Sequence, residues 1–413
     1  MNKIRLKEIS SKIGSGATPR GGKNSYKSEG ISLIRSMNVY DSAFEYTELA
    51  FIDEQQAKEL SNVQVERSDI LLNITGASVA RCCMVPNNLL PARVNQHVAI
   101  IRIKKELANP RHILYCLISH RYKQKLLAIA QGGATREALT KEKIEDFEIL
   151  LPLLSSQHKI ASILSAYDDL IENNLKRIKI LEEMAQMIYR EWFVSFRFPG
   201  HEKVKMVKSE LGMIPEGWEV KKLGEMLEFQ KGKKAKNIYH QPLNNSIPYL
   251  LIDGLRNRSF LYADDKTMPI AKRDDILMVM DGASSGQVFI GFEGAVGSTI
   301  GTYRIKDTNN LFSYLVYFFL KNNFKTISEK NIGSAIPHAN KNFIASMKIV
   351  TPKSNIVILF SDFASDIYKQ IDVLERKTLN LRKTRDLLLP KLISGEVDVE
   401  KVDINIDLME GKS

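Results

Sequence analysis

DILLNITGAS at residues 69–78 is matched by DILMVMDGAS at residues 275–284. Each copy is a short apolar run ended by a glycine turn, which is the pattern of a buried strand. Further similarities occur in the same order in both halves, for example Ile31–Ile34 with Ile247–Leu250. Five residues also recur 200 positions later: Gly133, Lys141, Ile144, Ile149 and Pro152 match Gly333, Lys341, Ile344, Ile349 and Pro352. The order of the matches predicts a tandem duplication.

The sequence around the repeated stretch predicts mixed α/β domains with short strands. Val98–Ile103 alternates in hydropathy as a strand does, and Gln287–Phe292 is a second alternating run. Pro110–Ala130 and Leu311–Phe324 have the apolar spacing of helices that pack on a sheet. Each half is therefore predicted to begin with one globular α/β domain.

A long helix is predicted after each globular domain, at about Gln157–Phe193 and about Ile356–Ile393. Apolar positions recur in alternating steps of three and four, as in coiled coils, although neither seam is purely apolar. The two helices are predicted to pair antiparallel, with polar Asn174 and Arg385 setting the register. The residues expected to pair are Ile171, Asn174, Ile178, Leu181, Ile188, Ile371, Leu374, Leu381 and Leu388. The alternative is two amphipathic helices, each packed on its own domain.

The fold class is therefore predicted as α+β: two mixed α/β domains in tandem duplication, separated by two long antiparallel coiled-coil helices. A polar segment with Pro and Gly at both ends marks the boundary between the halves. The predicted parts are domain 1 at 1–154, helix 1 at 155–195, a linker at 196–216, domain 2 at 217–352, helix 2 at 353–396 and a C-terminal tail at 397–413.

The positive charge of the chain is concentrated in the two globular domains. Of the net charge of +11, residues 1–154 contribute +6 (22 Lys and Arg against 16 Asp and Glu) and residues 217–352 contribute another +6 (18 against 12). Two basic blocks suggest two contacts with a polyanion, whereas the alternative is an ordinary solvated surface. Neither a secretory signal nor a membrane-spanning apolar run is visible, so a cytoplasmic location with reduced thiols is expected.

Motifs for catalysis are not recognisable in the sequence. Gly282-Ala283-Ser284-Ser285-Gly286 has the Gly-x-Ser-x-Gly spacing of a hydrolase nucleophile, but the alternating residues after it predict a strand where that motif needs a helix. No phosphate-binding loop is found, and the seven histidines lack metal-ligand spacing. The sequence therefore predicts neither a catalytic site nor a metal site.

Basic and amide side chains in Gly- and Asn-rich loops are the candidates for contacts with a nucleic acid, because Lys and Arg bind phosphates while Arg, Asn and Gln read base edges. In domain 1 they are Arg20, Lys23, Lys27, Arg35, Arg81, Arg93, Asn95, Gln96 and Arg136. In domain 2 they are Lys231, Lys233, Lys234, Lys236, Arg256, Arg258, Lys330 and Lys341.

The whole chain resembles the specificity subunits of type I restriction–modification systems. The resemblance is carried by GATP at 16–19, DILL at 69–72, YREWF at 189–193, FPG at 198–200, GMIPEGW at 212–218 and LLLPKLISGE at 387–396. Domain 2 departs from the pattern, since QKGKK at 230–234 stands where domain 1 has its Thr-Pro turn.

The resemblance implies a non-catalytic subunit of a bacterial or archaeal complex. Two target-recognition domains would each read one half of a split double-stranded DNA site. The helices would bind two modification (methyltransferase) subunits and, through them, restriction subunits. S-adenosylmethionine, ATP and magnesium would be bound by those partners, and no cofactor is expected on this chain. The alternatives are an enzyme with unrecognised motifs, an RNA-binding protein or a coiled-coil adaptor.

Overall fold

The computed structural model describes residues 2–132, 138–306, 311–333 and 336–400. The contacts divide the chain into two units, Met1–Ile171 with Asn380–Ser413 and Glu172–Leu379. Unit 1 therefore combines domain 1 with residues from the far end of the chain, while unit 2 is one continuous segment. Each unit contains part of both long helices, α6 (Leu154–Tyr189) and α12 (Ser354–Ser394).

In unit 1, two four-stranded sheets form the body of domain 1, as the layered architecture of α+β domains requires. The first sheet has the order β2 (Ser10–Ser15), β11 (Val98–Ile103), β8 (Ile70–Asn73), β9 (Cys82–Met84). The second has the order β6 (Ala50–Ile52), β3 (Ile31–Ile34), β10 (Ala92–Val94), β7 (Gln64–Val65). Two strand pairs complete the domain: β1 (Asn2–Arg5) with β12 (Glu148–Leu151), and β4 (Val39–Tyr40) with β5 (Ala43–Phe44). Its helices are α1 (Leu6–Ile9), α2 (Glu54–Glu59), α3 (Pro110–Ile118), α4 (His120–Gln131) and α5 (Lys141–Glu145).

Unit 2 repeats this plan with a larger second sheet. The first sheet has the order β16 (Leu227–Lys231), β24 (Ile300–Ile305), β21 (Ile276–Val279), β22 (Val288–Phe289). The second has the order β17 (Ile238–Tyr239), β19 (Leu261–Ala263), β18 (Ile247–Leu250), β23 (Gly294–Val296), β20 (Ile270–Ala271). The strand pairs are β13 (Met206–Ser209) with β14 (Gly212–Pro215) and β15 (Glu219–Lys222) with β25 (Lys348–Thr351). The helices are α7 (Leu223–Met226), α8 (Ile252–Asn257), α9 (Ser313–Asn322), α10 (Phe324–Glu329) and α11 (Lys341–Ser346).

The repeated stretch occupies the same place in both domains. Residues 70–73 form β8 and residues 276–279 form β21, and each strand is fully buried and pairs antiparallel with the long strand of its sheet, β11 or β24. The duplication predicted from the sequence is therefore visible in the topology, and the mixed α+β class is confirmed.

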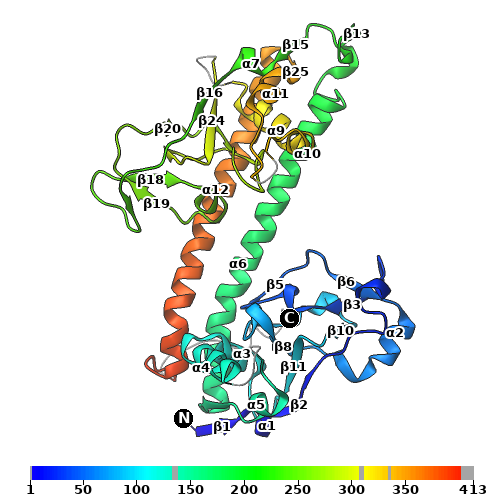
Figure 1. Cartoon of the computed structure of the whole chain (residues 1–413), viewed down its shortest axis with the longest axis vertical. Helices are drawn as coiled ribbons and strands as arrows, with labels where there is room; N and C mark the ends of the chain where they lie inside the picture. The colour runs from blue at the N-terminus through cyan, green and yellow to red at the C-terminus, as the bar shows by residue number, and fades with distance from the viewer. Residues whose placement is uncertain (1, 133–137, 307–310, 334–335, 401–413) are drawn as a thin grey trace. The chain divides into compact units, whose positions relative to one another are not determined.

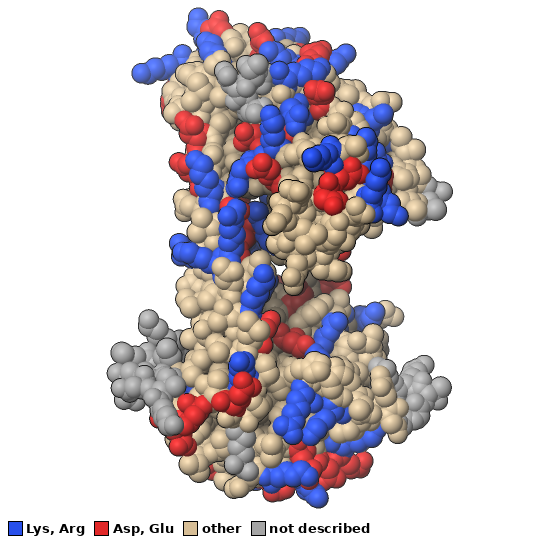
Figure 2. Space-filling model, turned by 90° about the vertical axis from the view of Figure 1, so that its left-hand side faces the viewer, with Lys and Arg blue, Asp and Glu red and all other residues tan. Residues whose placement is uncertain are grey.

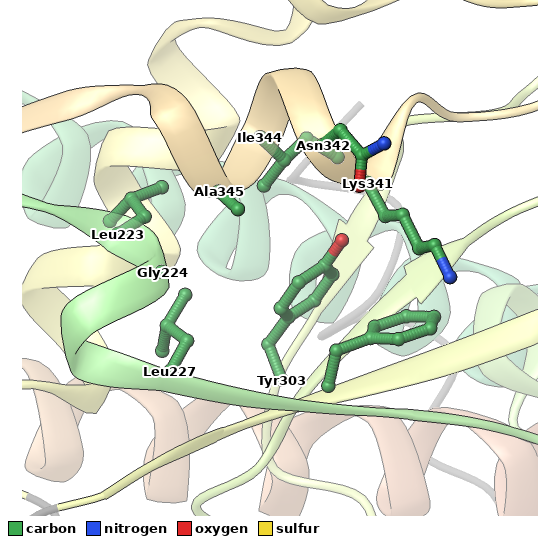
Figure 3. Close-up of a pocket in the computed structure, with 9 residues that line it drawn as sticks. Leu223, Gly224, Leu227, Tyr303, Lys341, Asn342, Ile344 and Ala345 are labelled. Atoms are coloured by element: carbon green, nitrogen blue, oxygen red, sulfur yellow. The ribbon is translucent and has the colours of Figure 1, made fainter.

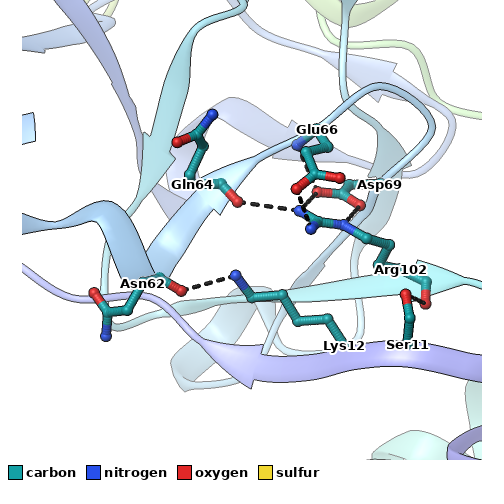
Figure 4. Close-up of polar contacts among 7 residues, drawn as sticks. All are labelled: Ser11, Lys12, Asn62, Gln64, Glu66, Asp69 and Arg102. Atoms are coloured by element: carbon teal, nitrogen blue, oxygen red, sulfur yellow. Dashed lines mark hydrogen bonds and ion pairs between the residues drawn. The ribbon is translucent and has the colours of Figure 1, made fainter. Parts of the chain in front are cut away.

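A bidentate ion pair fixes the start of this strand in both copies, and Figure 4 shows the pair of the first copy. The buried Asp69 carboxylate accepts hydrogen bonds from Arg102 Nε and Nη2, both at 2.8 Å, and one from the backbone N–H of Glu66 at 2.7 Å. Asp275 and Arg304 repeat the pair at 2.8 and 2.6 Å. Since a buried carboxylate needs such partners, the aspartate that opens the DIL motif is a structural residue.

A glycine is required where the strand β2 or β16 leaves its sheet. The backbone N–H of Gly16 donates to Val98 O, and that of Gly232 donates to Ile300 O, each at 2.9 Å. A Cβ atom at either position would lie 2.1 Å from a backbone oxygen, closer than any van der Waals contact. The backbone of Gly232 and Lys233 therefore makes the same hydrogen bonds as that of Gly16 and Ala17, although the side chains that follow differ.

The long helices run antiparallel in unit 1, where the start of α6 packs on the end of α12 (Figure 1). Arg385 Nη1 lies 2.7 Å from Asp168 Oδ1, while earlier in α6 Ser156 Oγ lies 3.4 Å from Oε1 of Glu400, beyond the end of α12. A residue further along α6 therefore contacts a residue earlier in the C-terminal segment, as expected for antiparallel packing. Apolar side chains from both helices, Ile160, Leu164, Leu389, Leu392 and Ile393, belong to the core of domain 1.

The same direction is found in unit 2. The ring of Phe360, near the start of α12, lies 4.8 Å from Phe193 and 6.3 Å from Tyr189, at the end of α6. Further along α12, Glu375 interacts electrostatically with Glu182. The helix α6 ends at Tyr189 in a π-helical turn, Arg190–Val194, rather than running to Phe193 as an α-helix.

The predicted seam residues lie on or near the apolar clusters of the helices. Ile171, Ile371 and Leu374 are buried. Ile178, Leu181, Ile188 and Leu388 are half-buried and pack against the cores, and Asn174 and Leu381 are half-buried. Arg385 forms ion pairs with Asp168 and Asp386.

One helix was predicted wrongly. Pro110–Ala130 is not continuous, because Ser119 adopts an extended conformation (ψ 141°) and separates α3 from α4. Its hydroxyl donates to Cys116 O at 2.7 Å, so the side chain satisfies a carbonyl at the end of α3.

Candidate nucleic-acid interface

Three loops of domain 1 converge at one corner beyond the ends of β2, β8 and β10. The backbone N–H of Ala17 donates to Val94 O, and that of Ile74 donates to His97 O, both at 3.0 Å. Residues 16–20, 74–78 and 95–97 are thereby held side by side. We call this the recognition corner of domain 1.

Polar side chains link these loops. Thr75 Oγ1 lies 2.7 Å from His97 Nδ1, and His97 Nε2 lies 3.1 Å from Gln96 Nε2. The side-chain amide oxygen of Gln96, Oε1, is also within hydrogen-bonding distance of Thr18 Oγ1. The half-buried His97 therefore supports Gln96, whose side chain is exposed to solvent.

The corresponding corner of domain 2 carries charge. Met280 N donates to Thr299 O at 2.8 Å, as Ile74 does to His97, so Asp281 corresponds to Thr75. Asp281 Oδ1 lies 2.7 Å from His338 Nδ1, and Asp281 Oδ2 lies 3.0 Å from Lys231 Nζ. Burial acts to raise the pKa of Asp281, but the hydrogen bonds from His338 and Lys231 outweigh it and lower that pKa. The two histidines were not predicted as site residues, since their single occurrence indicated only that no metal site was present.

Several predicted contacts of domain 2 surround this corner. Lys233 and Lys234 follow Gly232 and are exposed, as is Lys236. Arg256 Nη2 lies 2.7 Å from Ser284 Oγ of the repeated turn and also bonds Gln287. The exposed Lys330 ends α10, two residues before Ile332, which forms a bridge with His338.

Two predicted contacts of domain 1 are buried, which corrects the prediction. Arg93 is only 7% exposed, and its Nε donates to Ala57 O at 3.0 Å. Asn95 is 6% exposed, and its Oδ1 accepts from the N–H of His97 at 3.1 Å. Both side chains stabilise the domain and do not present hydrogen-bonding groups to a ligand.

Arg258 is also a correction, because it connects domain 2 to α12 within unit 2. Its guanidinium lies 3.0 Å from Asp372 and 2.7 Å from Glu375, and it stacks over the ring of Phe292 at 4.1 Å. A guanidinium with two carboxylate partners and one aromatic face covered has no free edge for DNA.

The other predicted residues of domain 1 vary in accessibility. Arg20 and Lys23 are exposed beyond the Thr-Pro turn, and Lys27 is exposed but paired with Asp53 at 3.2 Å. Arg35 and Arg81 are half-buried and stack on Tyr26 and Tyr40, at 5.8 and 4.8 Å respectively. Arg136 lies outside the described residues.

Lys341 lines a cavity of about 240 Å³ in domain 2, between α7, α11, β16 and β24 (Figure 3). The hydroxyl of Tyr303 points toward this cavity, and burial raises its pKa. Gly224 and Ala345 also line the cavity, where α7 and α11 approach each other closely.

Positive and negative side chains are mixed on one face of the molecule. Figure 2 shows Lys and Arg side chains interleaved with Asp and Glu on the face it draws. On that face, attraction for a polyanion depends on local groups of Lys and Arg rather than on one broad basic surface.

The geometry around Ser284 does not fit a hydrolase. The segment after the turn forms β22, whereas a nucleophile elbow needs a helix there. Among the described residues, no group of His, Cys, Asp and Glu could hold a metal ion, and no helix has the length and apolar character that a membrane span needs.

The fold combines long helices with two related domains, each of which carries a corner of converging loops. Comparison with known proteins identifies the family. The model of the type I restriction modification DNA specificity domain matches residues 1–183 and 215–385. The chain belongs to this family and is a recognition subunit rather than an enzyme.

Individual relatives agree over nearly the whole length. The chain is 27% identical to the type I restriction enzyme MjaIX specificity subunit of Methanocaldococcus jannaschii, covering 96% of this chain and 94% of the relative. It is 20% identical to the HindI specificity subunit of Haemophilus influenzae, covering 89% and 94%. The crystal structure of the type I restriction-modification S subunit from M. genitalium has a similar fold, with a TM-score of 0.63, 16% identity and 95% coverage of both chains.

Proposed function

We propose that the two domains read the two halves of a bipartite, asymmetric sequence in double-stranded DNA. The observation that supports this most directly is that the two corners share a backbone framework but carry different side chains. Thr75 and Gln96 present a hydroxyl and an amide, whereas domain 2 presents the Asp281 carboxylate, the Lys231 ammonium and the His338 imidazole. Since base edges are distinguished by their donors and acceptors, two such sets should select different bases.

Selection from a random duplex DNA library tests this proposal. The complex that contains the full chain should enrich two short sequence blocks, separated by a spacer of fixed length and free sequence. Exchanging Asp281 and His338 for Thr and Ala, the residues at the corresponding positions 75 and 138, should change one block and leave the other intact. One uninterrupted block, or no enrichment, would contradict the proposal and favour an adaptor.

The exposed face of α6 is the proposed docking surface for modification subunits. In unit 2, Ile180, Met184 and Met187 are 55%, 44% and 61% exposed, and their spacing of four and three places them on one side of the helix. Three large apolar side chains in a row are costly to leave in water, and they suit a partner helix. We propose two modification subunits per chain, with restriction subunits joining through them.

The docking surface can be tested with matched variants. Ile180→Asp with Met184→Asp should reduce co-purification of the modification subunit and leave the fold intact, because these side chains are exposed. Ile178→Asp with Leu181→Asp is the comparison, since these residues pack inward and their change should destabilise unit 2 as well. Normal co-purification of the first variant would exclude this surface.

The chemistry of the complex is assigned to its other subunits. S-adenosylmethionine, ATP and magnesium are expected to bind there, and the complex is expected to act on cytoplasmic DNA. Equilibrium binding of S-adenosylmethionine to the isolated chain should therefore be undetectable, and saturable binding would contradict this assignment.

A further inference from the structure

Gln96 is the most exposed polar side chain of the linked set in domain 1, and it is the one whose orientation is fixed on both sides. His97 Nε2 lies 3.1 Å from its amide nitrogen, and Thr18 Oγ1 contacts its amide oxygen. The ring of His97 is itself held by Thr75, at 2.7 Å. An exposed glutamine normally samples many rotamers, so this support reduces the entropy lost when the amide binds a ligand.

The remaining hydrogen-bonding capacity of Gln96 can be counted. A glutamine amide has two N–H donors and two acceptor lone pairs. One donor and one acceptor are used by His97 and Thr18. If the amide is turned over, His97 donates and Thr18 accepts, and the count is unchanged. One N–H and one lone pair of the same amide are left for a ligand outside the protein.

We propose that Gln96 is a specificity-determining residue that reads an adenine in the half-site of domain 1. In the major groove adenine offers an acceptor, N7, beside a donor, the N6 amine, which matches the free N–H and lone pair of the amide. Guanine offers two acceptors at the same edge, so it would leave the amide oxygen facing another oxygen. This inference rests on the proposed function and names the base contact within it.

Thr75 and His97 are positioning residues in this proposal. Asp281 holds His338 in domain 2 from the position that Thr75 occupies in domain 1, so both corners have an outer side chain supported from the same place. In domain 1 Thr75 holds the imidazole of His97, which in turn supports the Gln96 amide, whereas in domain 2 Asp281 holds the imidazole of His338, which is itself 53% exposed. The two domains thus hold different outer side chains from corresponding positions in their loops.

The test uses the full chain in its complex and a duplex that carries the selected site. Each adenine of the first block is replaced in turn by 7-deazaadenine, which lacks the N7 acceptor. At one position the wild-type protein should bind roughly tenfold to a hundredfold more weakly, in the range of a lost bidentate base contact. Gln96→Ala should bind the normal duplex similarly weakly and should lose little more with 7-deazaadenine.

Matched variants separate reading from folding. Gln55 is another exposed glutamine of domain 1, and Gln55→Ala should leave every base preference unchanged. His97→Phe should weaken discrimination at the same base pair while affinity for non-specific duplex stays normal. If 7-deazaadenine has no effect at any position, or weakens wild type and Gln96→Ala equally, Gln96 does not read adenine. The bipartite site itself would still stand in that case, because the random selection tests it separately.

Discussion

Removing Arg102 should destabilise domain 1 strongly while domain 2 stays folded. Asp69 has no exposed side-chain surface, and Arg102 supplies two of its hydrogen bonds at 2.8 Å. In Arg102→Met the Glu66 N–H remains, but the buried carboxylate loses the cation with which it is hydrogen-bonded. Breaking a buried ion pair by removing one partner costs about 3–5 kcal/mol.

Hydrogen exchange of the full chain measures this cost locally. Since 1.4 kcal/mol is a factor of ten, the most protected amides of β8 and β11 should exchange about two to almost four orders of magnitude faster in Arg102→Met. The amides of β21 and β24 should keep wild-type protection. Arg304→Met is the matched variant, and it should produce the reverse pattern.

A second substitution tests whether the unpaired charge is the cause. Adding Asp69→Asn to Arg102→Met removes the charge but keeps an oxygen that accepts from Glu66 N. The double variant should therefore recover part of the lost protection. The reasoning is refuted if Arg102→Met changes exchange in β8 by less than tenfold, or if the double variant is less stable than the single one.

Three further predictions concern pH, salt and spacing. Burial lowers the pKa of His112 from 6.5 to about 4. Below about pH 6.5 the unfolded chain therefore takes up a proton that the folded chain excludes. The free energy of unfolding should be highest above that pH and should fall by about 3 kcal/mol toward pH 4. In urea unfolding, His112→Leu should lose this part of the pH dependence. Replacing Lys233, Lys234 and Lys236 by Gln should make the slope of log K for DNA binding against log salt concentration less steep, by up to about 0.9 for each lost phosphate contact. An unchanged slope would show that these lysines do not contact DNA. Lengthening α6 and α12 by about four residues, or ~6 Å, should change the preferred spacer between the two DNA sequence blocks by one or two base pairs. The sequence of neither block should change.

The duplication and the long helices could be predicted from sequence because they depend on local periodicity. Val98–Ile103 is a strand with the predicted bounds, and the two DIL stretches are corresponding strands. The partner of Asp69 could not be predicted, since Arg102 lies 33 residues away on the neighbouring β11. A carboxylate at the start of an apolar strand indicates that a buried cation is needed but does not say which one.

Positive charge alone could not distinguish surface from interior. Arg93 and Arg258 have the same residue type as Arg20, and only tertiary contacts reveal that they bond to the protein itself. The histidines of the corners were missed for a related reason. Their neighbours Thr75 and Asp281 come from other loops, so no sequence spacing indicated that a ring would be held in place.

The discontinuous composition of unit 1 has a consequence for synthesis on the ribosome. Unit 2 is continuous from Glu172 to Leu379 and can pack as soon as it has emerged. The core of domain 1, in contrast, includes Leu389 and Leu392, which are translated more than 200 residues after Ile160 and Leu164. At a translation rate of about 5–20 residues per second, the apolar side chains of domain 1 stay exposed for at least about ten seconds before the end of α12 is synthesised. The domain made first is thus completed last, and a nascent chain that stalls within α12 would expose an unfinished core to chaperones and proteases.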